Sequence, residues 1–159
     1  MNHFYKIIKS PLGNLTLIAN DNALKSIAWM GEGVSKEKFP NAILKNDHPL
    51  LQETETELLE YFAGKRKKFT IKLDPDGTDF QKKSWAYLQK IPYGETRSYG
   101  EQAAGIGNKK ACRAVGGANG RNPIPIIIPC HRVIGSNGTL TGFASGVEIK
   151  KTLLDLEQG

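Results

Sequence analysis

The chain contains few residues that could hold a metal ion or form a disulfide. Its 159 residues include only two cysteines, Cys112 and Cys130, and three histidines, His3, His48 and His131. Their positions do not match the ligand spacing of a zinc site, so we expect no bound metal.

Long hydrophobic runs are also absent. No apolar stretch approaches the ~20 residues that a membrane-spanning helix needs. Residues 1–10 lack the basic and then apolar order of a signal peptide, so we expect a cytoplasmic protein with reduced thiols and no membrane partner. A phosphate-binding loop is missing too, because Gly105-Ile106-Gly107 lacks a third glycine and no Gly-Lys-Ser/Thr run occurs. We therefore expect no cofactor.

Charge is plentiful but unevenly distributed. Residues 1–79 contain eleven Lys/Arg and eleven Asp/Glu, whereas residues 80–159 contain eleven Lys/Arg and only five Asp/Glu. The second half therefore carries the whole net charge of +6. A basic half favours an anionic partner, with nucleic acid as the first candidate, although a generic basic surface gives the same count.

The first half has the pattern of a β-rich domain. Alternating apolar and β-branched residues predict an antiparallel meander of strands over 4–8, 15–19 and 24–29. A helix is expected after a cap at Asp47 or His48, with Pro49 in its first turn and Gly64 at its end. The apolar face of this helix is expected to consist of Leu50, Leu51, Leu58, Leu59 and Phe62.

A turn signal divides the chain. A short strand is expected over 69–73, and the run Asp74-Pro75-Asp76-Gly77 that follows marks a boundary. We therefore predict two domains, residues 1–77 and 78–159.

The second half has helix-start signals. Thr78 with Gln81, Ser98 with Glu101, and Ser145 with Glu148 each have the spacing of a capping box and predict three helices. A further helix is expected over 109–119 after a cap at Asn108. The short helix that starts near Ser98, the glycine turn and this further helix form a predicted helix-turn-helix.

The second helix of this motif is poor in base-reading side chains. Residues 111–118 are mostly small, and Arg113 is their one long cation. A helix that reads bases in the major groove needs several Asn, Gln, Arg or Lys side chains. We therefore predict sequence-tolerant binding in the minor groove, with Arg113 entering the duplex.

One of the two cysteines adjoins a histidine. Cys130 and His131 follow the apolar, proline-containing run 122–129. A neighbouring imidazole favours the nucleophilic thiolate, although a small buried cysteine in a core strand is the alternative.

Several segments occur together in a characteristic order. These are Ile91-Pro92-Tyr93-Gly94-Glu95-Thr96-Arg97-Ser98-Tyr99-Gly100, Arg113-Ala114-Val115-Gly116, Asn122-Pro123, Ile128-Pro129-Cys130-His131-Arg132-Val133-Ile134, and Gly135-Ser136-Asn137-Gly138 leading into Leu140-Thr141-Gly142-Phe143. In this order they resemble the O6-alkylguanine-DNA alkyltransferases, over roughly residues 78–157. The first half matches only in outline.

The resemblance implies an α+β fold and a repair activity. The fold would be a small N-terminal ribonuclease-H-like α/β domain of structural role, followed by a mostly helical winged helix-turn-helix domain that binds DNA and carries catalysis. The implied enzyme is a methylated-DNA–protein-cysteine S-methyltransferase, a monomer that acts once on double-stranded DNA. It would take an alkyl group from O6 of guanine, with O4 of thymine as a further substrate, after flipping the base.

The resemblance also implies roles for individual residues. Cys130 would be the acceptor, His131 would act on it through a water, Glu157 would orient His131, and Asn122 would support the turn. Tyr99 would rotate the nucleotide and donate to the guanine ring, while Arg113 would fill the gap in the stack. Further DNA contacts would come from Ser98, Tyr99, Lys109, Lys110 and Arg121, and the substrate pocket from Val133, Phe143, Ala144 and Ser145.

Alkyl transfer also suits the chemistry of these residues. Displacement at carbon needs a soft nucleophile, which a thiolate supplies, and a donor for the departing guanine, which a tyrosine hydroxyl supplies. Two other functions stay open on the sequence. One is a cysteine hydrolase, which uses the same thiolate–imidazole pair; the other is a DNA-binding module without catalysis, such as a damage sensor or a regulator.

Overall fold

The computed structural model describes residues 2–29, 38–140 and 146–159. The chain forms two compact units, residues 1–76 and 77–159. Within the described residues, no helix has both the length and the apolar character to span a membrane.

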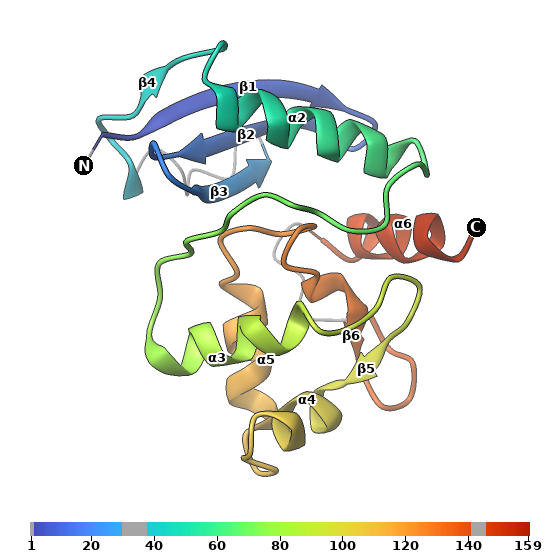
Figure 1. Ribbon diagram of the computed structural model, residues 1–159. Coiled ribbons are helices and arrows are strands. Elements are labelled where there is room, and N and C mark those ends of the chain that lie inside the picture. The colour runs from blue at the N-terminus through green and yellow to red at the C-terminus, as the bar shows by residue number, and fades with distance from the viewer. Residues whose placement is uncertain (1, 30–37, 141–145) are drawn as a thin grey trace. The chain divides into compact units, whose positions relative to one another are not determined.

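In its described residues, the first unit is a four-stranded sheet with helix α2 (Pro49–Phe62) packed on it (Figure 1). Strands β1 (Phe4–Ser10), β2 (Gly13–Ala19) and β3 (Leu24–Trp29) form the predicted antiparallel meander. Strand β4 (Ile43–Leu44) pairs in parallel with β1 and gives the order β3-β2-β1-β4. Strand β3 is buried at every position and β2 over most of its second half, so the core of this unit lies around these two strands.

Helix α2 packs on β1 and β2. Of the two predicted caps, Asp47 and His48, the structure has His48 at the cap position of α2. The His48 ring accepts a hydrogen bond from the Leu50 amide at 3.2 Å. The buried face differs from the expected one at Leu59, which is 42% exposed. Glu57 is buried instead, because its carboxylate accepts hydrogen bonds from the amide and hydroxyl of Thr70.

The predicted strand over 69–73 is wrong. Only Leu73 forms a bridge, to Leu24 on β3, with the Leu24 amide donating to the Lys72 carbonyl at 2.8 Å and the Asp74 amide to the Leu24 carbonyl at 2.9 Å. The backbone amide of Thr70 donates instead to the Glu57 side chain at 2.8 Å, so this stretch does not extend the ladder.

The second unit is mostly helical. Its elements are α3 (Asp79–Leu88), β5 (Arg97–Ser98), α4 (Tyr99–Gly105), α5 (Cys112–Gly120), the 3₁₀ turn η1 (Cys130–Arg132), β6 (Val133–Ile134) and α6 (Val147–Gln158). Helices α3, α4 and α5 pack on one another, and β5 pairs in parallel with β6 (Figure 1). Short helices beside a small two-stranded sheet form the winged helix-turn-helix that was predicted.

Two of the predicted capping boxes are confirmed. Thr78 with Gln81 starts α3, and Ser98 with Glu101 starts α4, each with both reciprocal hydrogen bonds. The last helix starts at Val147 with Gly146 in the cap position and no side-chain cap. The expected cap Ser145 lies outside the described residues.

The predicted start of the second helix of the motif is wrong. Helix α5 begins at Cys112, and its cap position is Ala111, which makes no side-chain cap. The reason is that Asn108 belongs to a turn: its carbonyl accepts from the Ala111 amide at 3.0 Å, after Gly107 with φ of 86°.

A buried pair of amides joins the two helices of the motif. Gln102 on α4 and Asn119 on α5 donate to each other's side-chain oxygens at 2.9 and 2.8 Å. The Gln102 amide nitrogen also reaches the Ser84 carbonyl on α3 at 3.3 Å. One buried polar group therefore ties helices α3, α4 and α5 together.

Gln102→Leu is expected to lower the free energy of unfolding by about 1–3 kcal/mol, because the buried Asn119 amide loses its partner. The double variant Gln102→Leu/Asn119→Leu should lose less than the sum of the two single variants, because it leaves no unpaired amide. Urea denaturation of the four proteins measures this coupling. Strictly additive losses would show that the pair contributes no mutual interaction.

Candidate active site

The loop before Cys130 is held in a strained conformation. Ile126 has φ of 76°, although a β-branched residue rarely adopts positive φ. Such a residue costs about 1–3 kcal/mol and persists only where its surroundings fix it. Here Asn122 fixes the loop, because its side chain accepts from the Ile124 amide at 2.9 Å and donates to the Ile128 carbonyl at 2.8 Å.

This loop leads directly into η1. The Cys130 amide donates to the Ile128 carbonyl at 2.8 Å, and Cys130, His131 and Arg132 are all buried. Asn122 also hydrogen-bonds the Cys130 thiol. One side chain thus contacts both the loop and the thiol.

His131 is fully buried and paired with a carboxylate. Its Nε2 lies 2.6 Å from Glu157 Oε2, and the Glu157 side chain is 1% exposed. Burial lowers the pKa of His131, and it outweighs the opposite effect of Glu157. Within residues 2–29, 38–140 and 146–159, His131 Nδ1 has no hydrogen-bond partner.

Arg132 binds the same carboxylate at two points. Its Nε donates to Glu157 Oε1 at 2.8 Å and its Nη2 to Oε2 at 3.0 Å. Its Nη1 donates to the Ile91 carbonyl at 2.7 Å. The guanidinium therefore has three partners while it is 8% exposed at the side chain, and it neutralises a buried charge.

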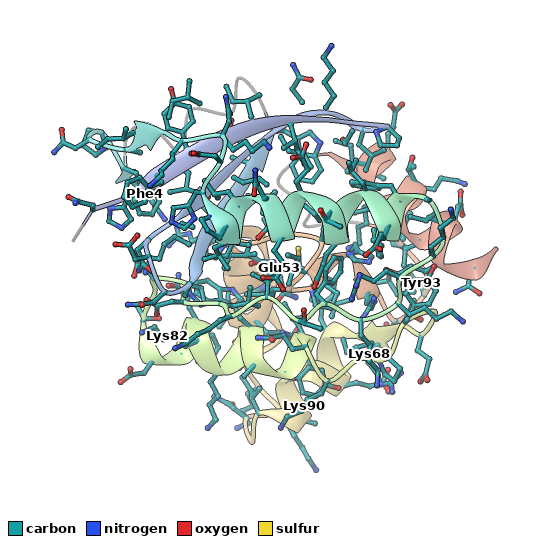
Figure 2. All side chains as sticks on the ribbon, turned by 45° about the horizontal axis from the view of Figure 1, so that its top comes forward. Phe4, Glu53, Lys68, Lys82, Lys90 and Tyr93 are labelled. Atoms are coloured by element: carbon teal, nitrogen blue, oxygen red, sulfur yellow. The ribbon has the colours of Figure 1, made fainter. Side chains whose placement is uncertain are left out.

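The loop after α3 closes on the end of α6. The Gly94 amide donates to Glu157 Oε1 at 3.4 Å, and the Tyr93 hydroxyl donates to the Leu156 carbonyl at 3.4 Å. Figure 2 shows Tyr93 beside α6, and its ring centroid lies 5.8 Å from the Arg132 guanidinium carbon. A Cβ on Gly94 would approach the Glu157 carbonyl oxygen to 3.3 Å, and its φ is 82°. Glycine is therefore needed here for both space and conformation.

The Cys130 thiol is a protonated thiol at rest. Its exposure is 6%, and burial raises its pKa, which the hydrogen bond from Asn122 and the charge of Lys150 partly offset. Proximity to His131 in the sequence therefore does not by itself produce a thiolate. A base must take the proton when the thiol reacts.

Lys150 supplies a positive charge beside the sulfur. It lies on the buried face of α6 with Leu153 and Glu157 and is 1% exposed. Burial lowers its pKa to about 8, although the charge of Cys130 acts in the opposite direction. The Lys150 Nζ lies 5.8 Å from the centroid of the Tyr99 ring, so Lys150 is close to both Tyr99 and Cys130.

Tyr99 is the first residue of α4 and is half-buried. A Cβ on Gly116 of α5 would lie 3.7 Å from its ring, so the tyrosine lies close against the second helix of the motif. The structure thus brings Tyr99 near Lys150, which itself acts on Cys130.

The expected DNA contacts lie on the surface. Arg113, Lys109, Lys110 and Arg121 are exposed, before, within and after α5. Ser98 is half-buried, and as the cap of α4 its hydroxyl accepts a hydrogen bond from the Glu101 amide at 3.0 Å.

The expected pocket residues are only partly described. Val133 is fully buried in β6, whereas Phe143, Ala144 and Ser145 lie outside the described residues. In the part of the chain that the structure describes, no three His, Cys, Asp or Glu side chains gather as metal ligands.

Two residues of this site were not assigned from the sequence. Arg132 belongs to the segment 128–134 that carries the resemblance but received no role, and Lys150 was not singled out. The signal for Lys150 was its spacing from Leu153 and Glu157, which places a lysine on the inward stripe of an amphipathic helix. The pairing of Arg132 with Glu157 had no local signal, because 25 residues separate them.

Two family models match almost the whole chain. The ribonuclease-like domain of 6-O-methylguanine DNA methyltransferase matches residues 3–75, and the DNA binding domain of the same enzyme matches residues 79–159. The chain is therefore an α+β protein with a ribonuclease-like sheet domain and a helical DNA-binding domain.

Relatives match over the same length. The methylated-DNA–protein-cysteine methyltransferase of Methanosarcina acetivorans is 52% identical over 154 residues, which is 97% of each chain. The constitutive enzyme of Bacillus subtilis is 45% identical over 98% of this chain and 96% of its own. The crystal structure of Mycobacterium tuberculosis OGT in complex with DNA is 44% identical, with a TM-score of 0.90, covering 98% of this chain and 92% of that one.

The fold and the matches define a DNA-binding transferase whose acceptor is a cysteine of the protein itself. The chain belongs to the 6-O-methylguanine DNA methyltransferase family, whose members repair DNA by alkyl transfer to cysteine. The resemblance stated from the sequence is confirmed.

The buried His131 is expected to make stability depend on pH. Its pKa in the folded protein lies below its ordinary value of 6.5, so the unfolded chain binds the proton more readily. The free energy of unfolding should therefore fall as the pH drops below about 6.5. Urea denaturation between pH 8 and pH 5 measures this loss, and His131→Gln should remove that part of it. An equal slope in the variant would show that other groups cause it.

Lys150→Met is expected to raise the pKa of Cys130 further, because the cation that favours the thiolate is lost. The rate of alkylation by iodoacetamide near neutral pH should then fall roughly tenfold. Lys151→Met is the matched control, since Lys151 is exposed and pairs with Asp155 at 2.7 Å. Unchanged thiol reactivity in Lys150→Met would exclude a role of its charge.

Proposed function

We propose that this protein repairs double-stranded DNA by moving an alkyl group, a methyl in the simplest case, from O6 of guanine to Sγ of Cys130. The bond between carbon and the guanine oxygen breaks, and a thioether forms. No group in the described site could cleave a thioether, so each molecule acts once. The observation that carries the proposal is the buried His131–Glu157 pair beside a buried thiol, with His131 Nδ1 unpartnered in the described residues.

His131 activates the thiol. A carboxylate only accepts hydrogen bonds, so His131 Nε2 carries the hydrogen and Nδ1 keeps a lone pair. The proton of Cys130 passes to Nδ1 through a bridging water. Lys150 then stabilises the thiolate by its charge, and Asn122 by its hydrogen bond. Burial keeps the thiol protonated until His131 takes its proton, which limits side reactions.

Tyr99 assists the leaving group. When the carbon–oxygen bond breaks, the electron pair moves onto the guanine, and a donor at a ring nitrogen stabilises the charge as it develops. The Tyr99 hydroxyl is proposed to donate there. The Lys150 ammonium, whose Nζ lies 5.8 Å from the centroid of the Tyr99 ring, adds positive charge near the proposed leaving group.

The helix-turn-helix presents the DNA. We infer that α5 lies in the minor groove, where small residues allow close approach and the exposed Lys109, Lys110 and Arg121 meet phosphates. The first turn of α5 has no side-chain cap, which leaves its amides suited to a phosphate. Arg113 occupies the place of the flipped base in the stack, and Tyr99 and Ser98 contact the rotated nucleotide.

The flipped base lies against η1 and β6. The carbonyls of Cys130 and Val133 are proposed to accept from its exocyclic amino group. Phe143, Ala144 and Ser145 would complete the pocket and set the size of the alkyl group. Thymine alkylated at O4 is a further proposed substrate. That the protein is a cytoplasmic monomer and needs no metal or cofactor remains a prediction.

The acceptor is identified by intact-protein mass spectrometry. Incubation with a duplex containing O6-methylguanine should add one methyl group to the wild type and to Cys112→Ala, and none to Cys130→Ala. Binding of Cys130→Ala to the duplex should remain, because the expected phosphate contacts come from Lys109, Lys110 and Arg121 and not from the thiol. A methyl group on Cys112, or catalytic turnover without a modified protein, would overturn the assignment.

Arg113→Ala is expected to slow methyl transfer from duplex DNA at least tenfold, because nothing then fills the stack. Transfer from the free base, O6-benzylguanine, should be unchanged, since a free base needs no flipping. Lys110→Ala is the matched control: it should weaken DNA binding and its salt dependence without slowing transfer at saturating DNA. Equal loss on duplex and free base would show that Arg113 acts on the pocket instead.

A further inference from the structure

The buried Arg132 shares the carboxylate of Glu157 with His131, the proposed general base. Arg132 and His131 are consecutive residues of η1, yet both side chains contact the same carboxylate, Glu157. Oε2 receives hydrogen bonds from both His131 Nε2, at 2.6 Å, and Arg132 Nη2, at 3.0 Å. The carboxylate is thus shared, and its charge is not available to the imidazole alone.

A carboxylate that contacted only the histidine would favour the protonated imidazole. An unbalanced negative charge within 3 Å favours imidazolium, and low exposure strengthens this attraction. An imidazolium has no lone pair on Nδ1 and cannot take a proton from a thiol. Activation of Cys130 therefore needs Glu157 to orient His131 without protonating it.

We propose that Arg132 is the positioning residue that neutralises Glu157, so that His131 stays an uncharged base for Cys130. This proposal rests on the proposed function only for its catalytic consequence. The protonation of His131 is a property of the protein without DNA and can be measured separately.

The charged groups around His131 agree with this role. Besides burial, the pKa of His131 is lowered by Arg132 from η1 and by Lys150 from α6, whereas Glu157 from α6 raises it. Cys130 adjoins it on η1, and Tyr93 packs over Arg132 from the loop after α3. Arg132 contacts both oxygens of the carboxylate directly, so it cancels the charge at its source.

Nuclear magnetic resonance of the histidine ring tests the proposal without DNA. The chain has three histidines, and His131→Gln identifies the signal of His131 while His3 and His48 serve as internal references. Arg132→Met should raise the pKa of His131 by about one to three units. The double variant Arg132→Met/Glu157→Gln should return it to or below the wild-type value, because the unbalanced charge is gone.

This reversal separates electrostatics from mere loss of structure. If Arg132 only filled space, the double variant would not restore the low pKa. Should Arg132→Met fail to fold, Arg132→Lys supplies the test, since it loses the two-point contact and should give a smaller upward shift. An unchanged pKa of His131 in Arg132→Met, or in Arg132→Lys when that is the variant tested, would overturn the proposal.

The catalytic consequence is a displaced pH profile. Methyl transfer by Arg132→Met should be at least tenfold slower than wild type at pH 6.5 and should recover toward wild type at pH 8.5, as His131 loses its proton. A uniform loss at all pH values would contradict the role. If wild type itself accepts no methyl group, the proposed function fails, whereas the titration of His131 still decides the role of Arg132.

Discussion

The buried carboxylate of Glu157 is the group around which the second unit is organised. It accepts from the imidazole of His131, from two nitrogens of Arg132 and from the Gly94 amide. These contacts join η1, the last turn of α6 and the loop after α3. Burying one negative charge beside one positive charge costs desolvation, and removing either partner would leave the other unpaired. The arrangement is therefore kept for the chemistry it allows rather than for the stability it contributes.

The same burial decides the state of the nucleophile. A thiol in this position stays protonated, so the protein does not carry a reactive thiolate while it searches DNA. In the proposed mechanism, activation depends on a neutral histidine with a lone pair on Nδ1, on the Lys150 charge and on the Asn122 hydrogen bond. Asn122 also holds the loop that leads to Cys130, in which Ile126 has a strained backbone conformation. A family member that is consumed by one reaction benefits from a sulfur that reacts only with its substrate.

Local signals predicted much of the fold but only part of the site. The meander, the α2 cap and the boxes at Thr78 and Ser98 each depend on residues within three or four positions, so the sequence shows them directly. The strand at 69–73 and the cap at Asn108 failed because tertiary partners decide both. Glu157 was assigned through family resemblance, although its spacing from Leu153 also places it on the inward face of α6. Arg132 was missed because its pairing with Glu157 spans 25 residues of sequence, whereas Lys150 had a signal in its helical spacing from Leu153.

The central claim is that His131 is neutral at rest, with its proton on Nε2 and a lone pair on Nδ1. The ¹⁵N chemical shifts of the His131 ring in the wild-type protein near pH 7 report this state directly. The account predicts one protonated nitrogen, Nε2, and one bare nitrogen, Nδ1. A ring protonated on both nitrogens, or on Nδ1 alone, would contradict it.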